Sequence, residues 1–153
     1  MRLNYEITIF GKKIQLVPYR KKFVENYHVW MQSPFLLEMT GSEPLTIEEE
    51  YEMQQSWRDD EKKCTFIILE NDPSTPETSR MVGDINLFLS KDENNQLQSE
   101  IDVMIAEEKY RRQGMGYEAV MAMMWYGHQH LQIKKFFSKI KEENEPSIEL
   151  FKR

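Results

Sequence analysis

Arg111-Arg112-Gln113-Gly114-Met115-Gly116-Tyr117-Glu118-Ala119-Val120 is a basic turn, punctuated by glycine, that runs directly into an amphipathic helix. Gly114 and Gly116 have no Cβ, so they can take backbone angles closed to other residues and let backbone N–H groups converge on an anion. The helix behind them offers free N–H groups and the positive end of its dipole. The pattern predicts a phosphate-binding turn, and the structural alternative is a plain strand-to-helix turn.

The segments around this turn predict a strand before it, and a helix and a second strand after it. Gln98–Ala106 alternates apolar and polar side chains, which is typical of a half-buried strand. A helix is expected from Gly116 to about Leu131, followed by a short strand at Phe136–Ile140. One face of that helix carries residues that we interpret as core packing: Val120, Met123, Met124, Gly127 and Leu131. Two strands joined through a helix in one sheet imply a parallel pair with a right-handed crossover.

The N-terminal half of the chain predicts a hairpin, two helices and two further strands. Aromatic residues at intervals of three and four indicate the first helix, which Pro34 closes. Thr46 begins the second helix, where its hydroxyl and the Glu49 carboxylate form a capping box, and the helix should run to about Glu61. The other expected features are the hairpin strands Ile7–Phe10 and Ile14–Val17 around Gly11-Lys12-Lys13, the aromatic stripe Phe23, Tyr27, Trp30 and Met31, and the strands Cys64–Glu70 and Met81–Ser90.

Length and composition indicate one globular domain. The chain has 153 residues, of which 40% are hydrophobic and 30% charged, enough to bury a single core without disulfides or a metal. Its net charge of −6 argues against a general nucleic-acid-binding protein. The positive charge is local, because Lys109, Arg111 and Arg112 directly precede the glycine turn, where an anionic ligand would need them.

The cysteine and histidine content and the hydropathy of the chain restrict the class of protein further. Cys64 is the only cysteine, which excludes an internal disulfide and favours a reducing compartment. We interpret it as a buried strand residue, with a reactive thiol as the alternative. His28, His128 and His130 lack the neighbours of a metal site, so no metal is expected. No window has the length of a signal peptide's apolar region or of a membrane span, so we expect a cytoplasmic protein without a membrane partner.

The two strands that precede the glycine turn bring acidic side chains together. If they pair as a hairpin around Asn94, burying their apolar faces together fixes the register parity. One polar face then gathers Asp84, Asn86, Glu100 and Asp102. This face is either simply solvated or a site of proton transfer, in which burial and mutual repulsion raise one carboxyl pKa toward neutrality.

The strand, glycine turn, helix and short strand, followed by Asn144-Glu145-Pro146-Ser147, resemble the GNAT superfamily of acetyl-CoA-dependent N-acetyltransferases. The cofactor motif of that superfamily, Arg/Gln-x-x-Gly-x-Gly/Ala, is matched at every fixed position by residues 111–116. The resemblance implies an α/β (α+β) fold with a mixed, mostly antiparallel sheet, flanking helices and a parallel strand pair after the cofactor strand. It also implies a cofactor site made of Val103, Met104, Ile105, Arg111, Arg112, Gln113, Gly114, Met115, Gly116, Tyr117, Asn144 and Ser147.

The same resemblance implies acetyl-CoA as the co-substrate and a protein amine, such as an N-terminal α-amine, as the acceptor. A backbone N–H of residues 103–106 would polarise the thioester carbonyl and stabilise the developing oxyanion. Glu100 and Asp102 are the candidate general bases, because the amine must be neutral to attack and their strand leads into the glycine turn. The chain is similar to superfamily members that act on tubulin, which implies tubulin as a partner.

The end of the chain departs from the family pattern. Phe151 stands where many members carry a tyrosine that protonates the leaving thiolate, and the sequence stops at Arg153, where the family continues into further strands. We therefore expect a single domain, incomplete at its C-terminal end, with reduced stability and weak or absent turnover. Two other hypotheses stay open. One is a CoA-binding or regulatory protein without turnover; the other is a protein that binds a different phosphate ligand, which is disfavoured because no Lys-Ser/Thr follows Gly116.

Overall fold

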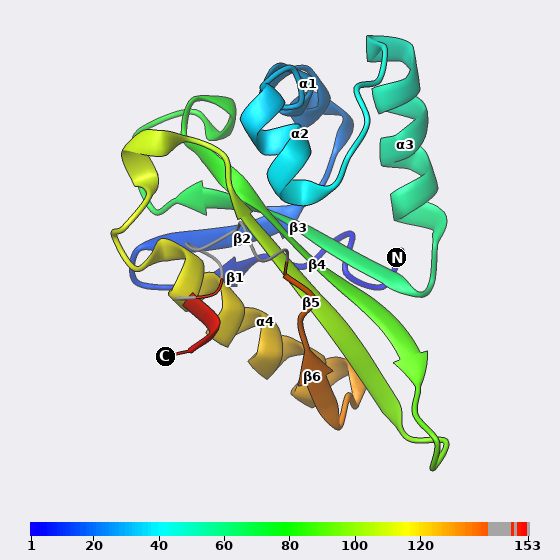
Figure 1. Cartoon of the computed structure of the whole chain (residues 1–153). Coiled ribbons are helices and arrows are strands. Elements are labelled where there is room, and N and C mark those ends of the chain that lie inside the picture. The colour runs from blue at the N-terminus through cyan, green and yellow to red at the C-terminus, as the bar shows by residue number, and fades with distance from the viewer. Residues whose placement is uncertain (141–147, 149, 153) are drawn as a thin grey trace.

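The computed structural model describes residues 1–140, 148 and 150–152, and in them the chain forms a six-stranded sheet with helices on both faces (Figure 1). The strands lie in the sheet in the same order as in the chain. Neighbouring strands are antiparallel except β5 and β6, which are parallel as predicted. The strands are β1 (Ile9–Phe10), β2 (Ile14–Pro18), β3 (Lys63–Glu70), β4 (Met81–Lys91), β5 (Leu97–Ile105) and β6 (Lys135–Phe137). The α-helices are α1 (Val24–Trp30), α2 (Pro34–Thr40), α3 (Ile47–Asp59) and α4 (Met115–Leu131).

Each face of the sheet supports its own apolar core. Figure 1 shows α1, α2 and α3 together on one face and α4 across the other. Strand alternation divides the side chains of β3 between the cores, so that Phe66 packs under α4 and Ile67 packs under the other helices. On the α4 side the rings of Phe66 and Tyr126 meet edge to face with centroids 5.5 Å apart. Burying one such large side chain contributes about 1.5–3 kcal/mol.

The predicted start of α3 is correct, and the predicted role of Pro34 is wrong. At α3 the Thr46 hydroxyl accepts from the Glu49 N–H, and the Glu49 carboxylate accepts from the Thr46 N–H, which confirms the capping box. Pro34 begins α2 instead of closing the first helix, with Ser33 as the N-cap. The fixed φ of proline and its missing N–H suit the first helical position, so the same residue can signal an end or a start.

The remaining boundaries shift by a few residues. The first hairpin strand is shorter than predicted and begins at Ile9, because the preceding segment forms turns, such as that closed by the Ile7 N–H on the Asn4 carbonyl. α3 ends at Asp59, and β6 occupies Lys135–Phe137 instead of Phe136–Ile140. No helix in the described part of the chain is long and apolar enough to cross a membrane.

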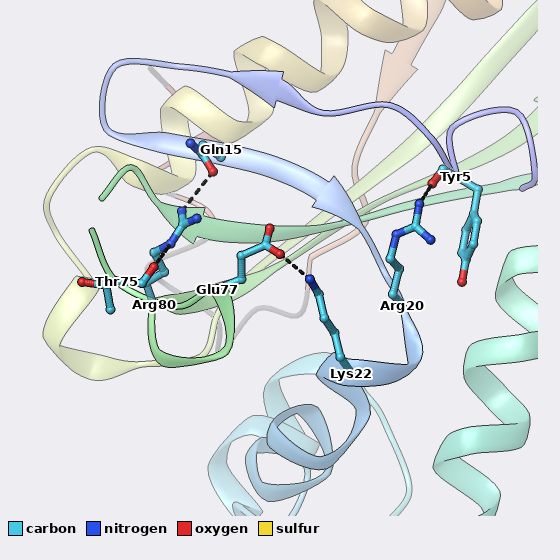
Figure 2. Close-up of polar contacts among 7 residues, drawn as sticks. All are labelled: Tyr5, Gln15, Arg20, Lys22, Thr75, Glu77 and Arg80. Carbon is cyan, nitrogen blue, oxygen red and sulfur yellow. Dashed lines mark hydrogen bonds and ion pairs between the residues drawn. The ribbon is translucent and has the colours of Figure 1, made fainter. Parts of the chain in front are cut away.

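Polar contacts hold the N-terminal hairpin to the loop that precedes β4 (Figure 2). The Arg80 guanidinium donates to the Thr75 carbonyl at 3.0 Å, and to the Gln15 side-chain oxygen at 2.9 Å. Beside it Lys22 pairs with Glu77. These contacts join β2 and the short 3-10 turn before α1 to the middle of the chain, so the hairpin is fixed relative to β3 and β4.

Candidate active site

β5 leaves one of its edges open next to the glycine turn. β6 pairs only with Gln98–Glu100, so within the described residues the rest of β5 has no strand on that side. Ala106 donates its N–H to a β4 carbonyl at 2.9 Å, and successive residues of a strand direct their backbone groups to opposite edges. The N–H groups of Val103 and Ile105 therefore face the open edge, whereas the backbone of Met104 faces β4. An extended ligand arm can hydrogen-bond along this edge.

Gly83 brings β4 close to the backbone of β5. A Cβ at this position would lie 1.7 Å from the Met104 carbonyl oxygen, so no residue with a side chain fits without moving a strand. No role is predicted for this glycine from the sequence. A glycine inside a strand is nevertheless a signal of close backbone approach, and here it fixes the strand that leads into the turn.

The glycine turn has the geometry of an anion cradle. Gly114 is the N-cap residue of α4 and is left-handed at φ 80°, and Arg112 is left-handed at φ 61°. The N-cap glycine makes no side-chain hydrogen bond to the start of the helix, so within the described residues the first N–H groups are available to a ligand. α4 begins at Met115, one residue earlier than predicted, which places Gly116 in the first turn.

The side chains of the turn divide between structural contacts and solvent. The Arg111 Nε donates to the Ile105 carbonyl at 3.0 Å, and another guanidinium nitrogen donates to the Ala106 carbonyl at 3.3 Å. Arg111 therefore holds the turn to the end of β5, although the sequence analysis placed it in the cofactor site. Arg112 is exposed, and Tyr117 is partly exposed on the first turn of α4.

The pairing of β4 with β5 confirms that the predicted polar side chains share one face. Asn86 lies opposite Asp102, and Phe88 lies opposite Glu100. Asp84 and Asn86 are only 4% and 6% exposed, because α1 and α3 cover this face. The alternative of a solvated face is therefore wrong for these two residues, while Glu100 and Asp102 remain half-buried at its rim.

A buried hydrogen-bond network ties this face to α1. The Tyr27 hydroxyl donates to Asp84 Oδ2 at 2.9 Å, and the Asn86 amide donates to the same oxygen at 3.3 Å. The Thr65 hydroxyl in turn donates to Asn86 Oδ1 at 2.7 Å. Burial raises the pKa of Asp84, and these hydrogen bonds oppose the rise. A satisfied buried network of this kind fixes the geometry around Asp102.

Asp102 has the environment of a general base. Burial, followed by the nearby carboxylates of Glu100 and Asp84, raises the pKa of Asp102 to about 6. Lys63 and Lys139 oppose that rise. A carboxylate with this pKa is charged at neutral pH and is still basic enough to accept a proton during a reaction.

Lys63 is a buried cation that the sequence analysis missed. Its side chain is 7% exposed, and its Nζ lies 3.7 Å from the centroid of the Trp57 ring and 4.2 Å from that of Phe88. Burial lowers the pKa of Lys63 to about 8, while Asp84 and Asp102 act in the opposite direction. A lysine at the start of a predicted strand gives no sequence signal of burial, because the rings that cover it come from other elements.

The other predicted residues are placed as follows. Cys64 is buried, which confirms its interpretation as a strand residue, and burial raises its thiol pKa to about 12. Asn144 and Ser147 lie outside the described residues. Phe151 packs against the core under α4. No three His, Cys, Asp or Glu side chains of the described part of the chain are grouped to hold a metal ion.

The open edge of β5, the glycine turn and the helix that follows it define the fold of an acetyltransferase. Residues 13–153 match the model of the acetyltransferase (GNAT) domain, and the chain belongs to that family. Over its whole length it is 51% identical to alpha/beta-tubulin-N-acetyltransferase 9 of Mus musculus and 50% identical to that of Homo sapiens. The chain spans 65% of the length of the mouse protein and 76% of the human one.

A solved structure agrees with this assignment of the fold. The crystal structure of a probable acetyltransferase superposes with a TM-score of 0.78 at 18% sequence identity, covering 97% of this chain and 82% of the other. At this identity the likeness concerns the fold alone. It includes the mixed sheet and flanking helices that the sequence analysis expected.

Proposed function

We propose that the chain transfers the acetyl group of acetyl-CoA to a protein amine, with Asp102 as the general base. The observation that carries this proposal is the course of β5, whose open edge leads from the carboxylates of the polar face to the glycine turn. One strand thus offers both a proton acceptor and a binding edge. Bound acetyl-CoA supplies an acyl group activated as a thioester.

The residues of the turn and of the strand fit this co-substrate. The left-handed Gly114 and the uncapped start of α4 present N–H groups suited to a pyrophosphate. The outward N–H groups of Val103 and Ile105 suit the amides of the pantetheine arm. An N–H at this edge also suits an oxyanion, which fixed donors stabilise in a site shielded from water.

Asp102 accepts a proton from the incoming ammonium group. The neutral amine nitrogen then bonds to the acetyl carbonyl carbon, the C–S bond breaks, and the thiolate leaves with the electron pair. The proton that the nitrogen loses as the amide forms passes to the thiolate, directly or through water. Glu100 lies two residues away on the same face and is the second candidate for the base. No enzyme nucleophile is needed, which agrees with the protonated state of the buried Cys64 thiol.

The pKa of Asp102 favours an α-amine over a lysine side chain as the acceptor. An α-amino group has a pKa of about 7.7–8.0 and a lysine about 10.4, so far more of the former is neutral near pH 7. A base with a pKa of about 6 is better matched to the less basic amine. The names of the mouse and human relatives support tubulin as the acceptor protein.

Replacing Asp102 by Asn tests the proposal. We expect acetyl transfer to an N-terminal tubulin peptide to fall on the order of 100-fold or more, the usual contribution of general-base catalysis. Wild-type turnover should decline as the pH falls through about 6, because Asp102 becomes protonated, and the Asp102→Asn variant should lose this dependence. Transfer is measured by mass spectrometry across pH, with an N-terminally blocked peptide as the acceptor control.

Glu100→Gln is the matched control, because it makes the same chemical change two residues away. It should leave the acidic limb of the pH profile in place. A wild-type profile in Asp102→Asn together with a flattened one in Glu100→Gln would reassign the base to Glu100. Saturable CoA binding without any acetylated product would instead favour the regulatory protein, a result that Phe151 at the family's tyrosine position makes worth testing.

A further inference from the structure

The tip of the β1–β2 hairpin lies against the start of α4. The Glu118 carboxylate accepts the backbone N–H groups of Lys12 and Lys13. The Lys13 Nζ donates to the Gln113 carbonyl at 2.8 Å. A Cβ at Gly11 would collide with Glu118 Oε1, so a larger residue there would displace this carboxylate from the hairpin tip. The hairpin tip is therefore built into the wall of the glycine turn.

A second anchor holds the hairpin tip from the opposite side. The Asn71 side-chain amide donates to the Gly11 carbonyl at 3.1 Å and to the Lys12 carbonyl at 3.2 Å. The Asn71 N–H also donates to the Lys13 carbonyl at 2.9 Å. With Glu118 on one side and Asn71 on the other, the backbone of both lysines is fixed before any ligand binds, which reduces the entropy lost on binding.

A hollow of about 650 Å³ lies between the hairpin tip and α4. Its lining includes the cations Lys12 and Lys13 and the aromatic rings of Phe10 and Tyr117. Phe10 is 72% exposed and Tyr117 is 39% exposed, so neither ring is accounted for by core packing. A second hollow, of about 670 Å³, borders the same two lysines on the side of Gln113.

The first hollow carries two cations, Lys12 and Lys13, against one carboxylate, Glu118, so its charge favours an anion, whereas Glu70 and Asp72 balance the two lysines at the second hollow. Glu118 is occupied by the two backbone N–H groups of the hairpin tip. Asp72, at the second hollow, accepts hydrogen bonds from Ser74 and Thr75, and Glu70 there accepts from the Tyr110 hydroxyl at 3.3 Å. Among the residues that the structure describes, none occupies the Lys12 ammonium group, and Lys13 retains two further N–H donors.

Arg111 does not supply a cation to these hollows. Its guanidinium is held on the carbonyls at the end of β5 and does not project into either hollow. The cationic side chains that line the hollows therefore come from the hairpin, which the chain reaches some 100 residues before the turn. Two exposed aromatic side chains can stack on a flat ring, and the neighbouring lysines can bind a phosphate. A phosphorylated nucleoside carries both groups.

We infer that the hairpin tip and the first turn of α4 form the subsite for the adenosine 3′-phosphate of acetyl-CoA. Lys12 and Lys13 bind the 3′-phosphate, and the rings of Phe10 and Tyr117 flank the adenine. This inference rests on the proposed function, because it assigns the far end of the same co-substrate. It adds a binding element that lies outside the glycine turn.

The test compares CoA with 3′-dephospho-CoA by calorimetry, in the wild type and in the Lys12→Ala/Lys13→Ala double variant. The wild type should bind CoA about tenfold more tightly, a difference of about 1.4 kcal/mol. In the double variant this preference should fall to near unity, with the affinity for 3′-dephospho-CoA unchanged. Lys134→Ala/Lys135→Ala is the matched control, since it removes the same charge from exposed positions at the other end of α4. Adenosine 3′,5′-bisphosphate should compete with CoA in the wild type only.

Several outcomes would overturn the inference. An equal loss of affinity for both ligands would assign the lysines to the pyrophosphate or to the support of the turn. A preference for CoA that survives in the double variant, or failure of the bisphosphate to compete in the wild type, would place the 3′-phosphate elsewhere. Absence of CoA binding in the folded wild type is a different result, because it refutes the proposed function before any variant is compared.

Discussion

At the scale of single residues, Lys63 destabilises the folded chain and also affects the pKa of the proposed base. An ammonium group that is 7% exposed has lost most of its water, and the rings of Trp57 and Phe88 replace only part of that solvation. Its positive charge restrains the pKa of Asp102 from rising further. The same cation is thus a cost to folding and a control on the proposed base.

Lys63→Met should stabilise the protein and shift its activity profile. The pKa of Lys63 is about 8 in the folded chain against 10.5 in the reference state, so the charged form costs up to about 3 kcal/mol at pH 7. Between these values the unfolded chain binds more protons, so wild-type stability should rise with pH from about 8 to 10.5, a rise that Lys63→Met should lack. Urea unfolding across pH measures both effects.

The same substitution should also change the pH dependence of turnover. Without the cation the pKa of Asp102 should rise, so the acidic limb of the pH–rate profile should move to higher pH. Lys62→Met is the control, because Lys62 is the exposed neighbour and its loss should change neither measurement. An unshifted acidic limb in Lys63→Met would show that Lys63 does not affect the pKa of the base.

At the scale of elements, α3 acts as a cover whose start is fixed by its capping box. Its Trp57 ring lies over Lys63, and its Gln54 amide donates to the Tyr19 carbonyl at 2.9 Å. The helix therefore shields the polar face from water. Local hydrogen bonds at its first turn and long-range contacts along its length both stabilise this helix.

Thr46→Ala should destabilise the protein by about 1 kcal/mol, the usual cost of losing a side-chain N-cap. The Glu49 N–H would lose its side-chain acceptor, and the first turn of α3 would fray. Chemical denaturation with an unchanged m-value would measure the loss. Thr8→Ala is the control at an exposed position outside the helices and should stay within about 0.5 kcal/mol. Equal stability of the two variants would show that tertiary contacts alone hold α3.

At the scale of the whole molecule, the candidate site joins the two cores of the sheet. The glycine turn belongs to α4 and the core beneath it, whereas the carboxylates lie on the face covered by α1 and α3. β5 is the element common to both. A ligand lying along β5 would therefore stabilise the folded chain as a unit.

CoA at a hundredfold excess over its Kd should add about 2.7 kcal/mol of stability and raise the melting temperature by roughly 5–10 °C. Gly116→Val should weaken this shift, because its Cβ would already lie 3.3 Å from Leu150 Cδ2 and its added methyl groups would crowd the first turn of α4, where the pyrophosphate is proposed to bind. Scanning fluorimetry with and without CoA measures it. Met121→Val places a β-branched residue at an exposed position of the same helix and should keep the shift. A shift of unchanged size in Gly116→Val would move the cofactor site away from the turn.

Local patterns in the sequence were sufficient for most of the framework. The capping box at Thr46, the left-handed Gly114 and the alternation along β4 and β5 act over a few neighbouring residues, so the amino acids alone specify them. The parity of two paired strands then placed Asp102 on the same face as Asn86. Pro34 was ambiguous because proline suits both a helix start and the residue after a helix end.

The features that the sequence did not predict depend on residues far apart in the chain. Burial of Lys63 requires Phe88 and the covering helix, and the contact of Lys13 with Gln113 requires the hairpin to meet the turn. The orientation of Arg111 depends on free carbonyls at the end of β5. Periodicity and turn chemistry report a residue's own neighbourhood, whereas desolvation and side-chain direction are set by whichever distant element packs against it. The sequence therefore determined the scaffold and the proposed base, and tertiary packing decided which charges surround them.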